Sequence, residues 1–175
     1  MDYFKIFDLD RGFNIDPKKL KIKYLKLSKE FHPDFHTNAS PMEQVKILER
    51  STELNKAYKT LSDPDALLHY MLDSEGLLDG KPDELPQAFL FEMMSFNERI
   101  MDARMEPDPV EIHQIQAEYS EIKDALDEDL NNAKDDYDQG KADQVLKTLR
   151  FLYFKKKYLN RVEEHMEKLN DILES

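Results

Sequence analysis

Proline at the start of predicted helices is the feature that most restricts what this chain can fold into. A capping side chain stands directly before a proline at several points, among them Asp16-Pro17, Ser40-Pro41 and Asp63-Pro64. The oxygen of the capping side chain accepts a hydrogen bond from a backbone N–H. Proline in the first turn costs no helical hydrogen bond, because a backbone N–H at that position would have no partner within the helix. Glu43 completes a capping box with Ser40. The sequence therefore predicts a chain of well-delimited helices.

The composition favours an all-α protein. The 175 residues include eight prolines, four glycines and no tryptophan, and no long alternating β-branched run is present. Cysteine is absent, which excludes disulfides and thiolate-held metals and fits a reducing cytoplasm. No apolar stretch approaches the roughly 20 residues of a membrane span, and the N-terminus MDYFKIFDLD is acidic. We expect a cytoplasmic protein with no membrane partner and no cofactor.

Charge is divided unevenly along the chain. The net charge of −12 argues against nucleic acid as a partner, because phosphate binding needs a cationic surface. Residues 1–75 hold 12 basic and 13 acidic residues, whereas residues 76–175 hold 13 and 24. A nearly neutral front part and an acidic rear part indicate two modules with different partners.

Glycine and proline between residues 74 and 86 mark the boundary between these modules. Before it we expect four helices, over Tyr3–Asp8, Pro17–Phe31, Pro41–Leu61 and Pro64–Asp73. After it we expect three, over Pro86–Met105, Pro109–Tyr137 and Lys141–Leu173. Long apolar stripes along the last two predict a three-helix bundle. The predicted division is therefore 1–75, a linker at 76–85, and a bundle at 86–175.

The second predicted helix is basic and leads to His32-Pro33-Asp34. Its buried side is predicted to carry Leu20, Tyr24, Leu27 and Phe31. A basic stripe lies about a quarter-turn away and is formed by Lys19, Lys23 and Lys26, with Lys18 and Lys29 alongside. Pro33 disfavours a helical conformation at His32, so the tripeptide begins the loop to the next helix. Such a stripe is either a solvated face or a surface for an acidic partner.

The helix predicted at 86–105 has too much apolar surface for one face. One stripe, suited to packing in the bundle, consists of Phe89, Met93, Phe96, Ile100 and Ala103. The second stripe consists of Leu90, Met94, Met101 and Met105, with Phe91 on its flank and Glu98 and Asp102 as a polar rim. Either both stripes are buried, one against the front module, or the second stripe is a protein-docking surface.

The basic helix followed by His32-Pro33-Asp34 resembles a J-domain, the module that stimulates ATP hydrolysis by DnaK-type chaperones. The resemblance implies that this tripeptide, together with Lys19, Lys23, Lys26 and Lys29, engages the chaperone ATPase. The chain would then be a co-chaperone and not an enzyme. No Gly/Phe-rich region or zinc-binding cysteine module is present, which disfavours a generalist DnaJ.

The whole chain resembles the HscB family of iron–sulfur co-chaperones. The shared features are MDYFKIFDLD, the His-Pro-Asp loop, LNKAYKTLSDP, LLHYML, AFLFEMM and LRFL. The resemblance implies an L-shaped all-α molecule whose bundle binds an IscU-type scaffold and delivers it to an HscA-type chaperone. By position, the implied scaffold-binding residues are Leu90, Phe91, Met94, Glu98, Asp102 and Phe151. The lack of cysteine pairs near the N-terminus favours a bacterial-type member.

Two positions depart from the family pattern, and two alternatives remain open. Ser95 stands where the family can carry a carboxylate, and Phe35 where many J-domains carry lysine. One alternative is a J-protein with another client. The other is a metal-dependent enzyme using His32 and His36, which would need further ligands.

Overall fold

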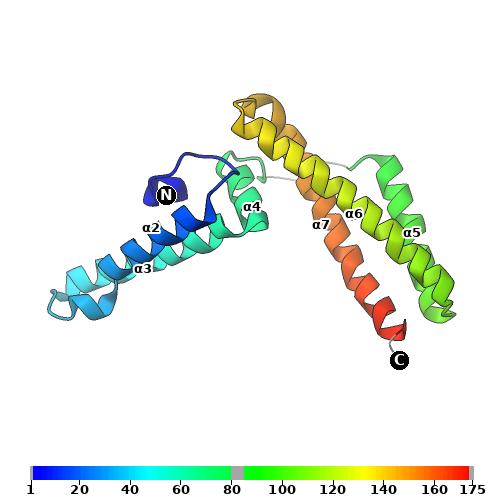
Figure 1. Ribbon diagram of the computed structural model, residues 1–175, viewed down its shortest axis with the longest axis horizontal. Coiled ribbons are helices and arrows are strands. Elements are labelled where there is room, and N and C mark those ends of the chain that lie inside the picture. Colours follow the sequence, from blue (N-terminus) through cyan, green and yellow to red (C-terminus); the bar gives the residue numbers. More distant parts are fainter. Residues whose placement is uncertain (1, 80–84, 174–175) are drawn as a thin grey trace.

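The computed structural model describes residues 2–79 and 85–173, apart from the side chains of 142–143 and 170–173. The elements are α1 (Tyr3–Ile6), α2 (Pro17–Glu30), the 3-10 turn η1 (Pro33–His36), α3 (Pro41–Ser62), α4 (Pro64–Ser74), α5 (Gln87–Met105), α6 (Pro109–Asp138) and α7 (Ala142–Leu173). No strand occurs in the described ranges. Helices α1–α4 form one arm and α5–α7 the other, and the arms meet at an angle (Figure 1). The predicted L-shaped all-α fold is confirmed.

The helix starts follow from the capping signals. The Asp16 carboxylate accepts the N–H of Lys18 at 2.8 Å, and the Asp63 carboxylate accepts that of Ala66 at 2.7 Å. Ser40 and Glu43 form the predicted capping box, and the hydrogen bonds from Ser40 lower the pKa of Glu43. The four helices that begin at a proline therefore start at the predicted residues, because a cap and a proline act locally.

The chain between the helices differs in part from what the sequence predicts. The 3-10 turn η1 was not predicted, since only a loop was expected after α2. The predicted linker covers 76–85, and residues 80–84 of it lie outside the described residues. The division into 1–75, 76–85 and 86–175 thus stays a prediction. No helix in the described part of the chain is both long enough and apolar enough to cross a membrane.

The N-terminal arm is a helical hairpin with a small core. Helices α2 and α3 pack against each other, and α1 and α4 cover one end of the hairpin (Figure 1). The buried side chains of this core are Phe4, Phe7, Leu20, Leu54, Ala57, Leu61, Leu67 and Met71. They gather toward the α4 end, so the tip of the hairpin, around η1, is left outside the core.

The C-terminal arm is the predicted three-helix bundle. The first stripe of α5, Phe89, Met93, Phe96, Ile100 and Ala103, is buried as expected. The predicted stripe of α7 is buried too, from Val145 to Leu169. At the surface, Arg99 of α5 forms ion pairs with Glu111 and Glu118 of α6, which raise the pKa of the guanidinium. Apolar periodicity therefore gave the correct buried faces of this arm.

Helix α4 joins the two arms because it contributes to both cores. Leu67 and Met71 are buried in the hairpin core, whereas Leu68 and Leu72 are buried in the bundle core. Beside these contacts, a nitrogen of the His69 ring lies 2.9 Å from the hydroxyl of Tyr153 on α7. A largely apolar stretch such as LLHYML does not reveal in advance which of the two cores each residue enters.

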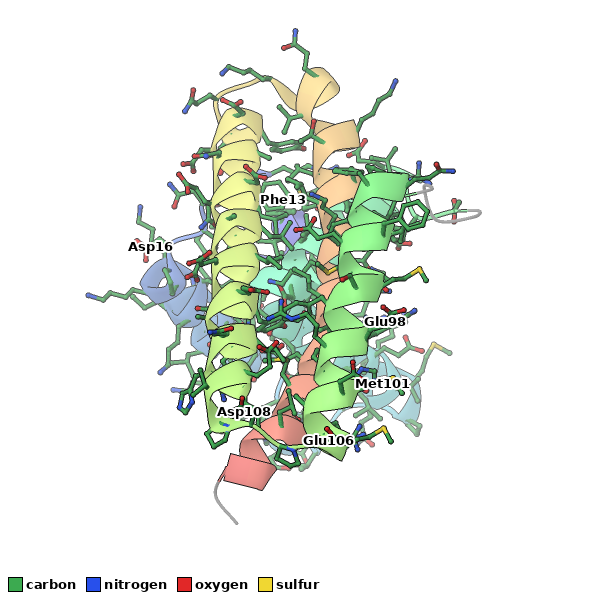
Figure 2. All side chains as sticks on the ribbon, turned by 90° about the vertical axis from the view of Figure 1, so that its right-hand side faces the viewer. Phe13, Asp16, Glu98, Met101, Glu106 and Asp108 are labelled. Carbon is green, nitrogen blue, oxygen red and sulfur yellow. The ribbon has the colours of Figure 1, made fainter. Side chains whose placement is uncertain are left out.

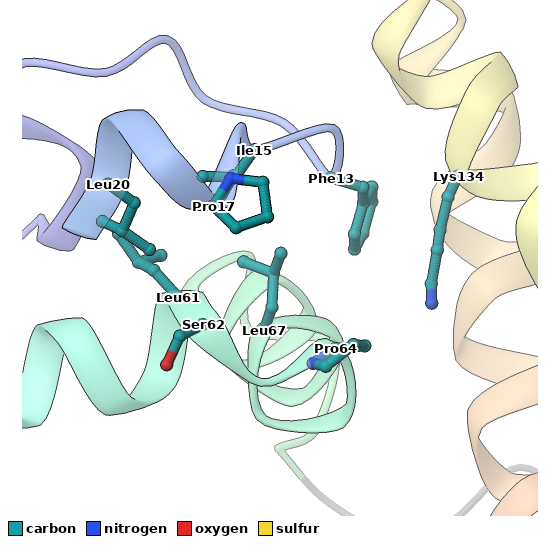
Figure 3. Close-up of a pocket in the computed structure, with 9 residues that line it drawn as sticks. All are labelled: Phe13, Ile15, Pro17, Leu20, Leu61, Ser62, Pro64, Leu67 and Lys134. Carbon is teal, nitrogen blue, oxygen red and sulfur yellow. The ribbon is translucent and has the colours of Figure 1, made fainter. Parts of the chain in front are cut away.

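Polar contacts at the joint tie the N-terminal loop to the end of α6. The Asp138 carboxylate accepts the backbone N–H of Phe13 at 2.8 Å and that of Asn14 at 2.7 Å. A Cβ at Gly12 would lie 2.6 Å from an oxygen of the same carboxylate, so a larger residue at this position would displace the Asp138 side chain. The Lys134 ammonium lies 6.0 Å from the centre of the Phe13 ring, across a small apolar pocket (Figure 3).

The same joint places two ammonium groups near each other. Burial, and next the neighbouring charge of Lys156, lower the pKa of Lys134. Lys156 is itself held by the Asp65 carboxylate, with 2.7 Å between Nζ and Oδ1. Since Lys156 lies on α7 and Asp65 on α4, this ion pair also connects the arms.

Replacing Asp138 by alanine should lower the free energy of unfolding by about 1 kcal/mol, because two backbone N–H groups lose a charged acceptor at an exposed site. Gly12→Ala should act in the same direction by displacing the carboxylate. Urea unfolding followed by circular dichroism measures both. Glu128→Ala, on the exposed side of the same helix, is the control and should change stability by less than about 0.5 kcal/mol. Equal stability of all three variants would contradict the role of this contact.

Candidate functional site

The His-Pro-Asp tripeptide forms a short, ordered turn at the tip of the hairpin. His32 is the N-cap of η1, and its Nδ1 accepts the backbone N–H of Asp34 at 3.2 Å. The N–H of Phe35 donates to the His32 carbonyl at 3.0 Å. An accepting Nδ1 carries no proton, so in the neutral ring the proton is on Nε2. The Asp34 side chain is 85% exposed and that of His32 49%, which leaves both accessible to a partner.

His36 holds this turn against the end of α2. Its Nε2 donates to the Glu30 carbonyl at 2.7 Å, which leaves only Nδ1 of this ring free for another contact. Within the described residues, no group of three or more His, Cys, Asp or Glu side chains could hold a metal ion. The geometry thus gives the His32/His36 metal alternative no support.

The basic stripe of α2 is only partly free. Lys19, Lys26 and Lys29 are exposed, whereas Lys23 is half-buried. The Lys23 Nζ donates to the Asp8 carbonyl at 2.5 Å and lies 3.5 Å from the Asp8 carboxylate. The sequence analysis missed Asp8 as a partner of Lys23, because Asp8 lies in the N-terminal segment and not on α2.

Exposed apolar side chains near the tripeptide were also missed. Ile22 and Leu25 of α2 are 67% and 56% exposed, and Phe35, directly after the tripeptide, is 66% exposed. Helix α3 adds an exposed row at three-residue spacing, Met42, Val45 and Leu48. That spacing was visible in the sequence and could have found the row. A partner at this tip would meet apolar surface as well as charge.

The second stripe of α5 is largely exposed. Phe91, Met94, Met101 and Met105 have exposed fractions of 67%, 55%, 61% and 81%. The alternative in which both stripes are buried is therefore wrong. Leu90 differs from the others because it is half-buried and packs against the bundle core. It combines a structural role with its predicted place on the stripe.

The predicted polar rim accompanies this stripe. Glu98 and Asp102 are exposed, and Figure 2 shows Glu98 and Met101 on the outer side of α5. Arg99 is turned to its partners on α6 and does not neutralise the rim. We call the second stripe, Phe91, Glu98 and Asp102 together the α5 docking face. It joins apolar side chains to negative charge, which is the arrangement of many protein interfaces.

Phe151 of α7 lies beside the N-terminal part of α5. The Lys155 ammonium is 5.0 Å from the centre of the Phe89 ring and 5.3 Å from that of Phe151, so one cation contacts both aromatic rings. Phe151 is half-buried and also lines a shallow groove toward α6. Its predicted place at the edge of the docking face stays a prediction.

Comparison with known proteins gives matches for both arms of the molecule. Residues 2–70 match the family model described as DnaJ domain, and residues 85–167 match the one described as HSCB C-terminal oligomerisation domain. The iron–sulfur cluster co-chaperone protein HscB of Mus musculus is 32% identical over 95% of this chain and 68% of its own length. This chain belongs to the HscB family. The resemblance expected from its motifs is confirmed.

Further HscB relatives agree with this assignment. The co-chaperone protein HscB homolog of Aeromonas hydrophila is 29% identical and is covered over 98% of its length, against 99% of this chain. The crystal structure of human co-chaperone protein HscB superposes with a TM-score of 0.73 at 26% identity, covering 98% of this chain and 83% of that one. Chaperone HscB from Vibrio cholerae gives a TM-score of 0.60 at 25% identity, over 95% and 99% of the two chains.

Leu90→Ala and Met94→Ala should distinguish a side chain that packs against the bundle core from one that is only exposed. Leu90→Ala should lower the free energy of unfolding by about 1–2 kcal/mol, because a half-buried leucine loses part of its core packing. Met94→Ala should change it by less than about 0.5 kcal/mol. Urea unfolding measures both values. Equal destabilisation by the two variants would contradict the distinction.

Proposed function

We propose that this protein is an adaptor co-chaperone of iron–sulfur cluster assembly. Its hairpin arm stimulates the ATPase of an HscA/DnaK-type chaperone, and its α5 docking face binds an IscU-type scaffold. It performs no catalysis of its own. The observation that carries the proposal is the exposed apolar and acidic face of α5, on a chain whose other arm exposes His32-Pro33-Asp34. Membership of the HscB family supports the same reading, since relatives are named as iron–sulfur cluster co-chaperones.

The hairpin arm would act on the chaperone through charge and shape. Lys19, Lys26 and Lys29 are exposed, so they can steer encounter with an acidic surface, an effect that salt weakens. The exposed Asp34 carboxylate and the His32 ring then contact the ATPase. Stimulation requires that they bind the hydrolysing conformation of the ATPase more tightly than its other conformation. Equal binding to both conformations would leave their populations unchanged.

The α5 docking face would hold the scaffold by a few apolar anchors. Phe91 and Met94 are large and exposed, and Met94 lies one helical turn before the exposed Glu98. Methionine adapts its shape to a partner, and aromatic side chains are common among residues that dominate binding energy. The acidic rim would select a scaffold surface with basic groups. This combination gives both affinity and orientation.

The two docking surfaces lie far apart, which matters for how they cooperate. The tip of the α2–α3 hairpin points away from the bundle, and α5 lies on the opposite side of the molecule (Figure 1). Both partners can therefore bind at once without collision. Holding them on one adaptor raises their effective concentration for each other. The contacts at the joint keep the separation and orientation of the two surfaces defined.

Asp34→Asn should abolish stimulation of the chaperone ATPase while scaffold affinity stays unchanged. The amide removes the negative charge at the tip of the hairpin and leaves α5 untouched. Steady-state ATP hydrolysis and isothermal titration with the scaffold measure the two properties. Glu128→Gln, which removes one carboxylate away from both surfaces, is the matched control. Loss of both properties in Asp34→Asn would contradict two separate surfaces.

Phe91→Ala combined with Met94→Ala should weaken scaffold binding by about 2 kcal/mol or more, since both side chains would be interface anchors. These positions test the surface better than Leu90, whose truncation also disturbs the core. Titration with an IscU-type scaffold, with and without cluster, gives the dissociation constants. Met42→Ala, an exposed methionine of the other arm, should leave them unchanged. A scaffold that fails to bind the unmodified protein would instead favour a J-protein with another client.

A further inference from the structure

The methionines between residues 2 and 173, which the structure describes, divide sharply by exposure. Met71 and Met93 are fully buried and Met166 is 5% exposed, so the two cores protect their sulfur atoms. Four other methionines are more than half exposed, and three of these are on one helix. These three are Met94, Met101 and Met105 of α5. The helix therefore concentrates accessible thioethers on a single face.

An exposed thioether can be oxidised without unfolding the protein. Its sulfur lone pair attacks one oxygen of a peroxide, the O–O bond breaks, an S–O bond forms, and water leaves. The sulfur loses two electrons, and the peroxide is reduced by the same two. Reductases reverse the step with two thiols, which become a disulfide as the oxygen leaves as water. Access of the peroxide to the sulfur decides which methionines react, so the exposed methionines of α5 are oxidised before the buried ones.

The surroundings of these sulfur atoms make the product poorly suited to an interface. Methionine sulfoxide carries an oxygen that accepts hydrogen bonds and loses free energy when it is buried without a donor. Glu98 lies one helical turn from both Met94 and Met101, and its ionised carboxylate only accepts. It also repels the partial negative charge of the sulfoxide oxygen. The acidic rim therefore offers no hydrogen-bond donor to the sulfoxide oxygens of the oxidised stripe.

We propose that Met94, Met101 and Met105 form an oxidation site within the α5 docking face, at which peroxide weakens scaffold binding reversibly. The inference rests on the proposed scaffold function and adds a regulation of that surface. The modification acts on contact chemistry, because the buried methionines of both arms remain thioethers and the fold persists. The result is an adaptor that releases its scaffold under peroxide and recovers it through methionine sulfoxide reductases.

The test compares scaffold binding before and after oxidation of this chain alone. The protein is treated with hydrogen peroxide, the peroxide is removed, and the scaffold is then added, so that the scaffold is never oxidised. Peptide mass spectrometry identifies the modified methionines, and circular dichroism checks the fold. Scaffold affinity should fall roughly ten-fold, equivalent to about 1.4 kcal/mol. Treatment with the reductases MsrA and MsrB should restore the affinity. This part of the experiment needs no variant.

Leucine variants show which methionines cause the loss of scaffold affinity. The triple variant Met94→Leu, Met101→Leu and Met105→Leu keeps apolar bulk without an oxidisable atom, and its affinity should be unchanged by peroxide. Met42→Leu, on the other arm, is the matched control and should lose affinity as the unmodified protein does. Affinity that stays the same although all three α5 methionines carry oxygen overturns the inference. So does a loss that the reductases cannot reverse. A scaffold that fails to bind before peroxide is added refutes the proposed function instead.

Discussion

The sharing of α4 between two hydrophobic cores is the constraint on which the rest of the molecule depends. Leu67 and Met71 are buried with the hairpin, and Leu68 and Leu72, each one residue further on, are buried with the bundle. Successive residues of a helix are about 100° apart, so turning one pair out of its core turns out the other. The two arms are coupled by packing, in addition to the segment that connects them.

Polar contacts at the joint between the arms fix the orientation of this packing. Asp138 holds the backbone after Gly12, and the Lys156–Asp65 ion pair crosses from α7 to α4. Each is worth little alone at an exposed position. Together they limit rotation about the apolar contact, which by itself is non-directional. The orientation of the hairpin tip relative to α5 follows from both kinds of contact.

The two candidate surfaces consist of side chains that the two cores leave exposed. The tip of the hairpin lies beyond the hairpin core, and the second stripe of α5 faces away from the bundle core. Met94 and Met101 thus remain exposed while Met93, the neighbour of Met94 in the chain, is fully buried. Adjacent residues of one helix therefore have separate roles, since one packs in the core and the next belongs to the proposed docking surface.

The sequence by itself determined the helices, the buried faces of the bundle and the two candidate surfaces. Caps, proline and apolar spacing act over a few residues, so they can be read without tertiary contacts. Only the tertiary structure decided the rest. It assigned the apolar residues of α4 to two cores, paired Lys23 with Asp8 and placed Leu90 half inside the bundle. Those outcomes join residues distant in the chain or on different elements, and spacing along one helix carries no information about what will pack beside it.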